Sequence, residues 1–497
     1  MADISPPQAN DDDKSHQPGD NSQDGCTHCP PKKAFTSVVT LILLCLLLWS
    51  ALWSVVGDDA LPGGNLFALF VLVILGEVAG FVMEAIHLPG LLGMLLIGFL
   101  LRNIPCDTLR LAEDILPSWS ASLRSMALVV ILLQAGLGLD AGALRSLSVV
   151  CIRLCCLPCI AEAVTAAVAS HFILGLPWLW GLMLGFVLGA VTPAVIVPSL
   201  MSLQTKGYGK DQGIPTLIIA AASCDDVLAI SAFGVIMGMA LSTGNVVYNI
   251  FKGPLELVIG LLCGVIGGVI LWSIPNHNQQ VQLRSVFLVC GGLLSVFGSD
   301  LAGFPGAGAL GCLTVAFLAG HGWKVAKAST RQPVERDIGY LWLLFQPLLF
   351  GLIGAEISLK DLDPSTLGLG LLTLCIGLIV RTFVSALAVT RAGLNMKEKI
   401  FIAVAWLPKA TVQAAIGSVA LDKVKGLDDE LESYAIQILT IAVLSILITA
   451  PLGAILIALL GPRLLQMCKQ EKGTTSTEGN KQPHEPQQEQ ETLMGIG

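Results

Sequence analysis

Two adjacent carboxylates occupy the middle of an apolar stretch that is long enough to cross a lipid bilayer. Asp225 and Asp226 lie within residues 214–241, whose central part reads IIAAASCDDVLAI, and a transmembrane helix needs about 20 residues. An ionised carboxylate at that depth costs at least about 3 kcal/mol, so buried acids usually bind a cation or carry a proton. Two neighbouring carboxylates also repel each other. The alternative is a pair that is neutralised by protonation or by a basic neighbour and serves only packing.

Two other apolar stretches carry a proline near mid-membrane. Thr192-Pro193 interrupts one of them and Pro408-Lys409 the other. Proline removes a backbone donor and clashes with the preceding turn, and the freed backbone groups are tolerated only where they line a cavity or coordinate an ion. Two interrupted helices therefore indicate a transporter site, in which Lys409 would offset the negative ends of the half-helices. An ordinary proline kink and a snorkelling lysine are the structural alternatives.

Two opposite charges lie within two further apolar stretches. Glu162 and Arg381 would each be costly to bury alone, so we expect them to form an ion pair. Arginine does not release its proton in a protein, so this pair could be purely structural. Gln413 follows Lys409 by one helical turn and could face the same cavity. Glu356 could line the path or lie beside a kink.

The composition indicates a polytopic membrane protein. Of the 497 residues, 54% are hydrophobic and only 13% are charged, whereas soluble domains carry about 25% charged residues. Residues 35–465 are therefore expected to form one transmembrane domain. Residues 1–34 and 466–497 are polar and are expected to be disordered tails. The first apolar stretch begins behind a long polar tail, so no signal peptide is expected.

Most of the 14 cysteines lie in apolar stretches, where they behave as small hydrophobic residues. Cys26 and Cys29 form a lone C-x-x-C motif without a second ligand pair, so no zinc site is expected there. The four cysteines within residues 151–159 have a metal-like spacing. A helix should scatter them around its axis, so we interpret them as packing residues.

Between the tails, apolar segments predict an all-α protein with about 14 transmembrane helices. They are residues 35–56, 65–86, 88–101, 119–139, 141–172, 176–203, 214–241, 255–274, 283–299, 306–320, 338–357, 366–392, 399–421 and 431–465. The two interrupted segments are the sixth and the thirteenth, and the spans with Glu162 and Arg381 are the fifth and the twelfth. The two members of each pair lie seven positions apart in the order of the spans. Because seven is odd, the two copies have opposite orientations in the membrane, and the chain is predicted to contain inverted repeats.

The basic residues predict the orientation in the membrane. An even number of spans places both tails on the same side, and with the tails in the cytoplasm 18 basic residues lie on that side and 6 on the other. This asymmetry is what the positive-inside rule requires. We therefore expect both termini to be cytoplasmic.

The geometry of a helix predicts different roles for the two aspartates. Adjacent residues point about 100° apart, so one carboxylate should project at the crossing of the broken helices and the other at its flank. Na⁺ or Li⁺ binds several oxygens, which the aspartates, Thr192 and carbonyls freed near Pro193 could supply. A proton and a cation compete for the same carboxylate, which together with alternating access is sufficient for antiport. The sequence has no phosphate-binding loop motif, so no ATP is needed.

These motifs together resemble the cation:proton antiporters, in particular the animal sodium/hydrogen exchanger 9B subfamily. The resemblance covers residues 35–463 and rests on Cys224-Asp225-Asp226, Thr192-Pro193, Pro408-Lys409, and Glu162 with Arg381. It implies the fold of the bacterial sodium/proton antiporters, with two crossed broken helices, and a homodimer. An ion-binding bundle would move like an elevator against a dimerisation bundle.

The resemblance also implies roles and a location. Asp226 would be the main ion and proton carboxylate and Asp225 its helper. Residues 35–56 would be an additional helix that contributes to the dimer. The protein would exchange Na⁺ or Li⁺ for H⁺ and contribute to pH and sodium homeostasis. The resemblance implies the plasma membrane, including that of sperm flagella, and leaves endosomal and mitochondrial membranes open.

Several questions stay open at this point. Bacterial electrogenic relatives carry a lysine where this chain has Arg381. If that lysine carries a second proton, this chain moves one proton per cation, although its two aspartates argue for more. Na⁺, Li⁺ and K⁺ are not distinguished, and a cation channel or a sodium-coupled symporter are alternatives. An intramembrane aspartyl protease needs its aspartates on different helices. No enzymatic activity, cofactor or nucleic-acid partner is expected.

Overall fold

The computed structural model describes residues 32–104, 111–138, 149–209, 214–241, 246–273, 280–325, 331–358 and 364–467. Most of the two predicted tails, including Cys26 and Cys29, lies outside these residues. The chain divides into two units, Met1–Leu61 and Pro62–Gly497.

The first unit contains a single long helix. Helix α1 (Lys32–Val56) is followed by a 3₁₀ turn, η1 (Gly57–Ala60). The indole N–H of Trp49 donates a hydrogen bond to the Ala60 carbonyl at 2.8 Å, which ties the turn back to the helix. The leucine side chains of α1 are largely exposed, as expected for a helix whose solvent is lipid.

All regular structure in the described part of the second unit is helical. Its elements are α2 (Asn65–Ala85), α3 (Gly90–Asn103), α4 (Pro117–Gly138), α6 (Val149–Leu174), α7 (Trp178–Gly189), α8 (Pro193–Thr205), α9 (Ile214–Ala240), α10 (Val246–Trp272), α11 (Gln280–Leu293), η2 (Leu294–Gly298), α12 (Ser299–Leu301), α13 (Pro305–Val325), α14 (Arg331–Glu356), α15 (Pro364–Ala388), α16 (Met396–Ala405), α17 (Thr411–Gly417), α18 (Val419–Val424) and α19 (Asp429–Leu464).

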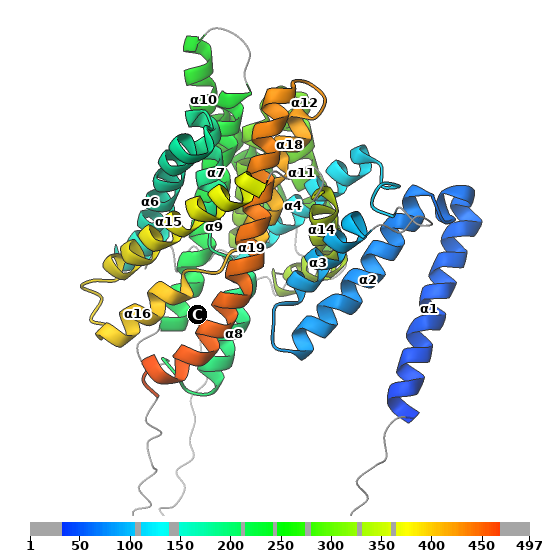
Figure 1. Ribbon diagram of the computed structural model, residues 1–497, viewed down its shortest axis with the longest axis horizontal. Helices are drawn as coiled ribbons and strands as arrows, with labels where there is room; N and C mark the ends of the chain where they lie inside the picture. The colour runs from blue at the N-terminus through cyan, green and yellow to red at the C-terminus, as the bar shows by residue number, and fades with distance from the viewer. Residues whose placement is uncertain are drawn as a thin grey trace, which may run out of the picture. The chain divides into compact units, whose positions relative to one another are not determined.

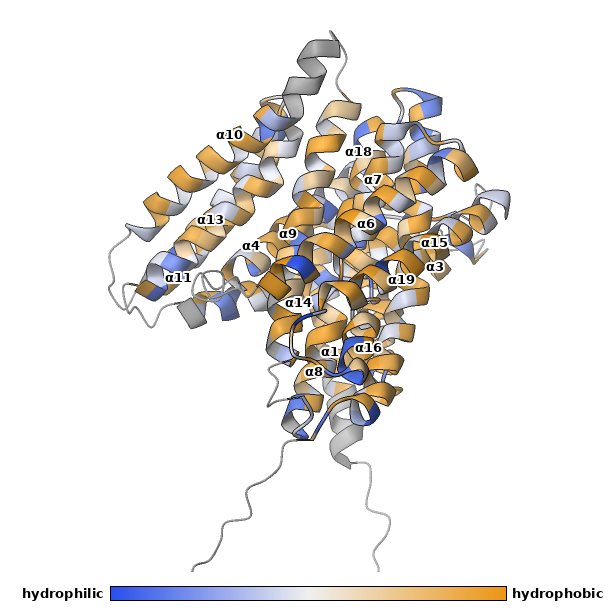
Figure 2. Ribbon diagram, turned by 90° about the vertical axis from the view of Figure 1, so that its left-hand side faces the viewer, coloured by the Kyte–Doolittle hydropathy of each residue, from blue (hydrophilic) through white to orange (hydrophobic). Residues whose placement is uncertain are grey.

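Length and composition make these helices a multi-pass membrane bundle. Among the described residues, 11 helices are long and apolar enough to cross a membrane. The all-helical fold class is therefore confirmed, while the number of 14 crossings stays a prediction. Helix α3 is short, and α13 is longer than the predicted span 306–320. Apolar residues cover most of α10, α13 and α19 (Figure 2), which suits contact with lipid and with other helices.

The two interrupted helices break where the sequence predicts. Helix α7 ends at Gly189, the chain is extended through Thr192, and Pro193 begins α8. Proline is favourable at that position because the first N–H of a helix needs no intrahelical partner. The second break separates α16 from α17 and contains Pro408. The extended segments meet, since the Thr192 N–H donates to the Pro408 carbonyl at 3.1 Å.

The helix that carries the two aspartates lies beside this crossing. Helix α9 packs against α6, α7, α10 and α13. In Figure 1, α8 and α16 lie at the lower end of the bundle, and α12 and α18 lie at the upper end. The broken helices therefore separate a lower half from an upper half, and the following description uses these two ends.

Close packing of α3 against α14 depends on glycine. A Cβ atom on Gly98 would lie 1.9 Å from the Gly351 carbonyl oxygen. We expect Gly98→Ala to destabilise the protein by about 1–3 kcal/mol, because the two helices must move apart. Gly368→Ala in α15 is the matched control, since no atom lies within 4 Å of its Cβ position. Thermal unfolding in detergent measures the difference, and equal stability of the two variants would contradict it.

Candidate functional site

The two adjacent aspartates of α9 have different surroundings. Asp225 is fully buried, and its Oδ2 accepts a hydrogen bond from the Val191 N–H at 2.8 Å. The same oxygen lies 3.3 Å from Nη2 of Arg381. Asp226 is 5% exposed, and its Oδ1 has no hydrogen-bond partner in the described part of the chain. Asp225 is thus held at the helix crossing, and Asp226 lies at its flank.

Four charged side chains form a buried cluster next to the crossing. Glu162 of α6 lies between two cations: Arg381 of α15 contacts it at 2.5 Å and Lys409 at 2.8 Å. Arg381 also contacts Asp225, so it joins the two acids. The side chains of all four residues are completely buried. The structure therefore brings the predicted partners Glu162 and Arg381 together and adds Lys409 and Asp225 to them.

The cluster also neutralises the C-terminal end of α7. Arg381 Nη1 donates to the Gly189 carbonyl and Lys409 Nζ to the Leu188 carbonyl. The Gln413 amide donates to the Ala190 carbonyl at 2.8 Å. The last carbonyls of a helix lack intrahelical partners and carry partial negative charge. Two cations and an amide thus cover this end, which is the compensation that the sequence predicts for Lys409.

The charges of the cluster balance. The two acids Glu162 and Asp225 face the two bases Arg381 and Lys409, so together the four groups carry no net charge when ionised. Asp226 then adds one uncompensated negative charge when it is ionised. An isolated charge is costly to bury. Asp226 is therefore the group in this site that gains most from a proton or a cation.

A cavity of about 380 Å³ adjoins Asp226. Its lining residues are Ile131, Gln134, Ala135, Gly138, Pro193, Ala194, Val197, Asp226, Trp342 and Thr411. Successive turns of α8 line it, so it extends from the crossing toward the lower end of the bundle. Gln134, Asp226 and Thr411 are lining residues whose side chains carry oxygens, and hard cations bind to oxygen ligands.

The hydroxyl groups at the crossing differ from the prediction. Thr192 is completely buried, and its Oγ1 lies 2.9 Å from Oγ1 of Thr411. Thr411 lines the cavity, whereas Thr192 is not among the lining residues. Thr411 was not predicted from the sequence. It is the first residue of α17, and Thr192 directly precedes α8, so each threonine lies beside the start of the second half of a broken helix. Thr449, whose Oγ1 accepts the Lys409 N–H at 2.9 Å, was not predicted either. A hydroxyl residue beside each break is the signal that could have found Thr411.

The cysteines of α6 are arranged differently from the prediction. Cys151, Cys155 and Cys159 are buried and follow one another at four-residue intervals, so they share one face of the helix rather than being scattered. Cys156 is only partly buried. No group of three potential metal ligands occurs within the described ranges.

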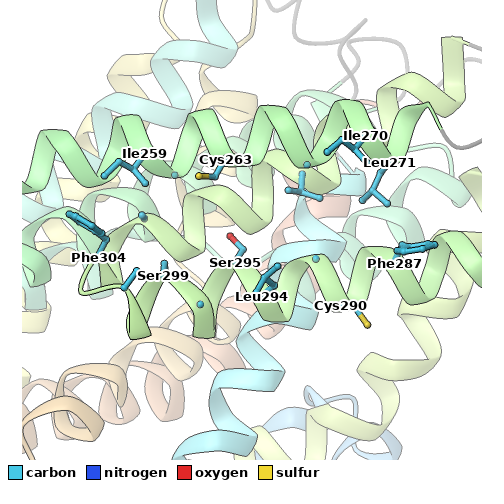
Figure 3. Close-up of a pocket in the computed structure, with 17 residues that line it drawn as sticks. Ile259, Cys263, Ile270, Leu271, Phe287, Cys290, Leu294, Ser295, Ser299 and Phe304 are labelled. Carbon is cyan, nitrogen blue, oxygen red and sulfur yellow. The ribbon is translucent and has the colours of Figure 1, made fainter.

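A larger cavity of about 620 Å³ lies elsewhere, between α10, α11, η2 and α13. Figure 3 shows that the side chains pointing into it are mainly Ile259, Ile270, Leu271, Phe287, Leu294 and Phe304. No acid or base is among its lining residues in the described structure. An apolar cavity offers no charged ligand for a cation, so this cavity is not a candidate ion site.

Comparison with known proteins agrees with this geometry. A family model described as "Sodium/hydrogen exchanger, transmembrane" matches residues 66–460. The chain is 50% identical over 462 residues to sodium/hydrogen exchanger 9B2 of Homo sapiens, which covers 91% of this chain and 84% of that protein. It is 44% identical over 445 residues to sodium/hydrogen exchanger 9B1 of Homo sapiens, which covers 88% and 85%.

The fold also has a counterpart among solved structures. The sodium proton antiporter MjNhaP1 from Methanocaldococcus jannaschii superposes with a TM-score of 0.64. It is 19% identical, and the match covers 80% of this chain and 98% of that chain. A likeness at this level of identity shows the fold, and it confirms the predicted antiporter-like architecture. The relatives confirm the family resemblance.

Proposed function

This chain belongs to the sodium/hydrogen exchanger family and is a membrane-embedded Na⁺/H⁺ antiporter, and we propose that Asp226 is the carboxylate at which the two ions compete. The observation that carries this proposal is the contrast between the two aspartates. Asp225 contacts Arg381 and the Val191 N–H, whereas Asp226 lines the cavity. One carboxylate oxygen of each aspartate lacks a hydrogen-bond partner among the described residues, so the contrast lies in the contacts and in the cavity.

The surrounding residues position Asp226 and limit the charge of the site. Arg381 and Val191 hold Asp225 at the crossing, and Lys409 and Arg381 hold Glu162. Gln134 and Thr411 supply further oxygens toward a cation at Asp226. Thr192 acts through its contact with Thr411. Pro193 and Pro408 keep the helices broken, so that the backbone at the crossing stays extended.

Cation-driven proton movement tests this function directly. The full chain is reconstituted in liposomes, and the internal pH is followed after Na⁺ or Li⁺ is added outside, with the voltage clamped by K⁺ and valinomycin. We expect each cation to drive protons outward as it enters. A cation current without proton movement would overturn the proposal and favour the channel.

The balanced cluster leads us to propose an exchange of one cation for one proton. Asp226 is neutral with a bound proton and neutral with a bound monovalent cation, so the loaded site carries the same charge in both directions. We therefore expect a change of 100 mV in membrane potential to leave the exchange rate unchanged. A net movement of one charge would bias the process by about 2.3 kcal/mol per 100 mV. Proton flux at a series of clamped voltages measures this, and a voltage-dependent rate would contradict it.

The orientation and assembly follow from separate observations. Because basic residues are concentrated on the side of the tails, we place both termini in the cytoplasm, which makes the cavity at Asp226 the cytoplasmic entrance.

The exposed apolar surface of α1 supports a role in a homodimer. Removal of residues 1–61 should then leave a monomer in mass photometry. The plasma membrane is the location that we propose.

A further inference from the structure

We propose that the outward route for the cation is the seam between α9 and α18 on one side and α4, α12 and α14 on the other, and that three ion pairs at the upper end hold it shut. This inference rests on Asp226 being the ion site. The proposal names residues that control access to that site rather than residues that bind the ion.

A small cavity marks this seam above Asp226. It has a volume of about 90 Å³, compared with about 380 Å³ for the cavity at Asp226. Its lining residues are Ser125, Leu128, Ile230, Phe233, Gly234, Met237, Val296, Phe297, Asp300, Ala309, Ile416, Val419 and Lys423. Ile230, Phe233 and Met237 are the next turns of α9 after Asp226, in the direction away from the lower cavity.

The lining of the small cavity blocks a hydrated cation. Phe233 and Met237 are nearly completely buried, at 2% and 3% exposure. They meet Leu128 of α4 and Ile416 of α17 in the same space. Transfer of a cation from its hydration shell to such an apolar surface has a large cost in free energy. The seam must therefore open before a cation at Asp226 can reach the upper end.

Glycine lets α9 approach its neighbour closely along this seam. A Cβ atom on Gly234 would lie 3.2 Å from the carbonyl oxygen of Gly306, at the start of α13. The Glu256 carboxylate lies at the same contact, where its Oε2 accepts the Gly306 N–H at 3.0 Å. The short distance shows that α9 and α13 pack closely beside the small cavity.

The ion pairs join the end of the second broken helix to its surroundings. This end carries Asp422, Lys423 and Lys425, and each of these residues pairs with a different element. Asp422 contacts Arg124 of α4, Lys423 contacts Asp300 of α12, and Lys425 contacts Glu356 of α14 at 2.5 Å. Arg124 also lies 3.3 Å from Glu356. The contacts thus form a bridge across the upper end, and the Lys423–Asp300 pair lies at the small cavity itself.

The pairs differ in how strongly they should hold the seam. Arg124 is 3% exposed, and an unpaired buried charge is costly, so loss of its partner should weaken closure strongly. Lys423 and Asp300 are 30% and 43% exposed, so their pair is screened by water and should contribute less. The bridge can break when the seam opens, because water then reaches all six side chains.

Reactivity of a cysteine in the small cavity tests this inference. Met237→Cys is introduced into the full chain, and intact cells are treated from outside with a membrane-impermeant methanethiosulfonate. Fragment-ion mass spectrometry that assigns the modification to position 237 separates this site from the native cysteines, including Cys224 of the same helix. We expect slow modification of Met237→Cys alone and at least about tenfold faster modification when Arg124→Gln is added. Arg463→Gln, at an exposed arginine that donates a hydrogen bond to the Leu459 carbonyl of its own helix, is the matched control and should have no effect.

A charge exchange provides a test that does not depend on Arg124. Asp300→Lys and Lys423→Asp should each accelerate the modification, and the double variant should restore protection because the pair is rebuilt with reversed sign. Modification that is equally fast in every background, or no protection in the double variant, would overturn the inference.

The variant Asp226→Asn separates a failure of this inference from a failure of the proposed ion site. Addition of Asp226→Asn should abolish exchange and leave the protection of Met237→Cys dependent on Arg124. If Asp226→Asn still exchanges ions, the ion site is wrong regardless of the labelling. If exchange is lost as expected but the modification rate of Met237→Cys does not depend on the ion pairs, only the proposal that the ion pairs hold the seam shut is wrong.

Discussion

Replacement of Asp226 by asparagine is expected to reduce cation-driven proton movement to the background of empty liposomes. Asparagine keeps the size of the side chain but can neither take up a proton nor balance the charge of a cation. Because the remaining four charges balance, no other group in the site can take over this role. The measurement is the internal pH of liposomes after addition of Na⁺ or Li⁺.

The neighbouring aspartate provides the comparison. Asp225→Asn should weaken the apparent cation affinity by about tenfold or more without abolishing exchange, since removal of one buried charge changes the binding free energy by about 1.4 kcal/mol or more. Its side-chain oxygen can still accept the Val191 N–H. Glu84→Gln, at an exposed acid at the end of α2, is the control and should behave as wild type. Equal signals from wild type and Asp226→Asn would remove the carboxylate mechanism.

Glu162→Gln is expected to cause a large loss of stability. Glu162 is the only partner of the Lys409 ammonium group among the charged side chains described, and it also contacts Arg381. Its neutralisation leaves two buried cations with Asp225 alone, and a broken buried ion pair costs about 3–5 kcal/mol. Thermal or denaturant unfolding in detergent measures the effect.

A second substitution separates charge from packing in this prediction. Lys409→Met removes the extra cation and keeps a side chain of similar length, so Glu162→Gln with Lys409→Met should recover much of the lost stability. Glu430→Gln, at an exposed acid of α19, is the control and should change stability by less than about 1 kcal/mol. A double variant that is no more stable than Glu162→Gln would show that the cluster does not depend on balanced charge.

Sequence alone determined the fold class and several of the residues that meet at the crossing of the broken helices. Charges and prolines within apolar spans are costly, so they stand out against the composition and mark Asp225, Asp226, Pro193 and Pro408. The pairing of Glu162 with Arg381 was expected for the same reason, and the structure places them in contact. The breaks could be located because proline acts on its own helix, which is a local effect.

The tertiary structure decided which atoms meet. Two adjacent aspartates are equivalent in sequence, and only the position of Arg381 on a distant helix shows that Asp225 is the paired one. The bridge around Arg124 was missed because charged residues near helix ends are common, and the sequence does not show which of them meet. The cost of placing a charge or a proline in an apolar span depends on that span alone, so it can be inferred from the sequence. The contacts between side chains depend on how helices far apart in sequence pack, and residue types and spacing do not specify that packing.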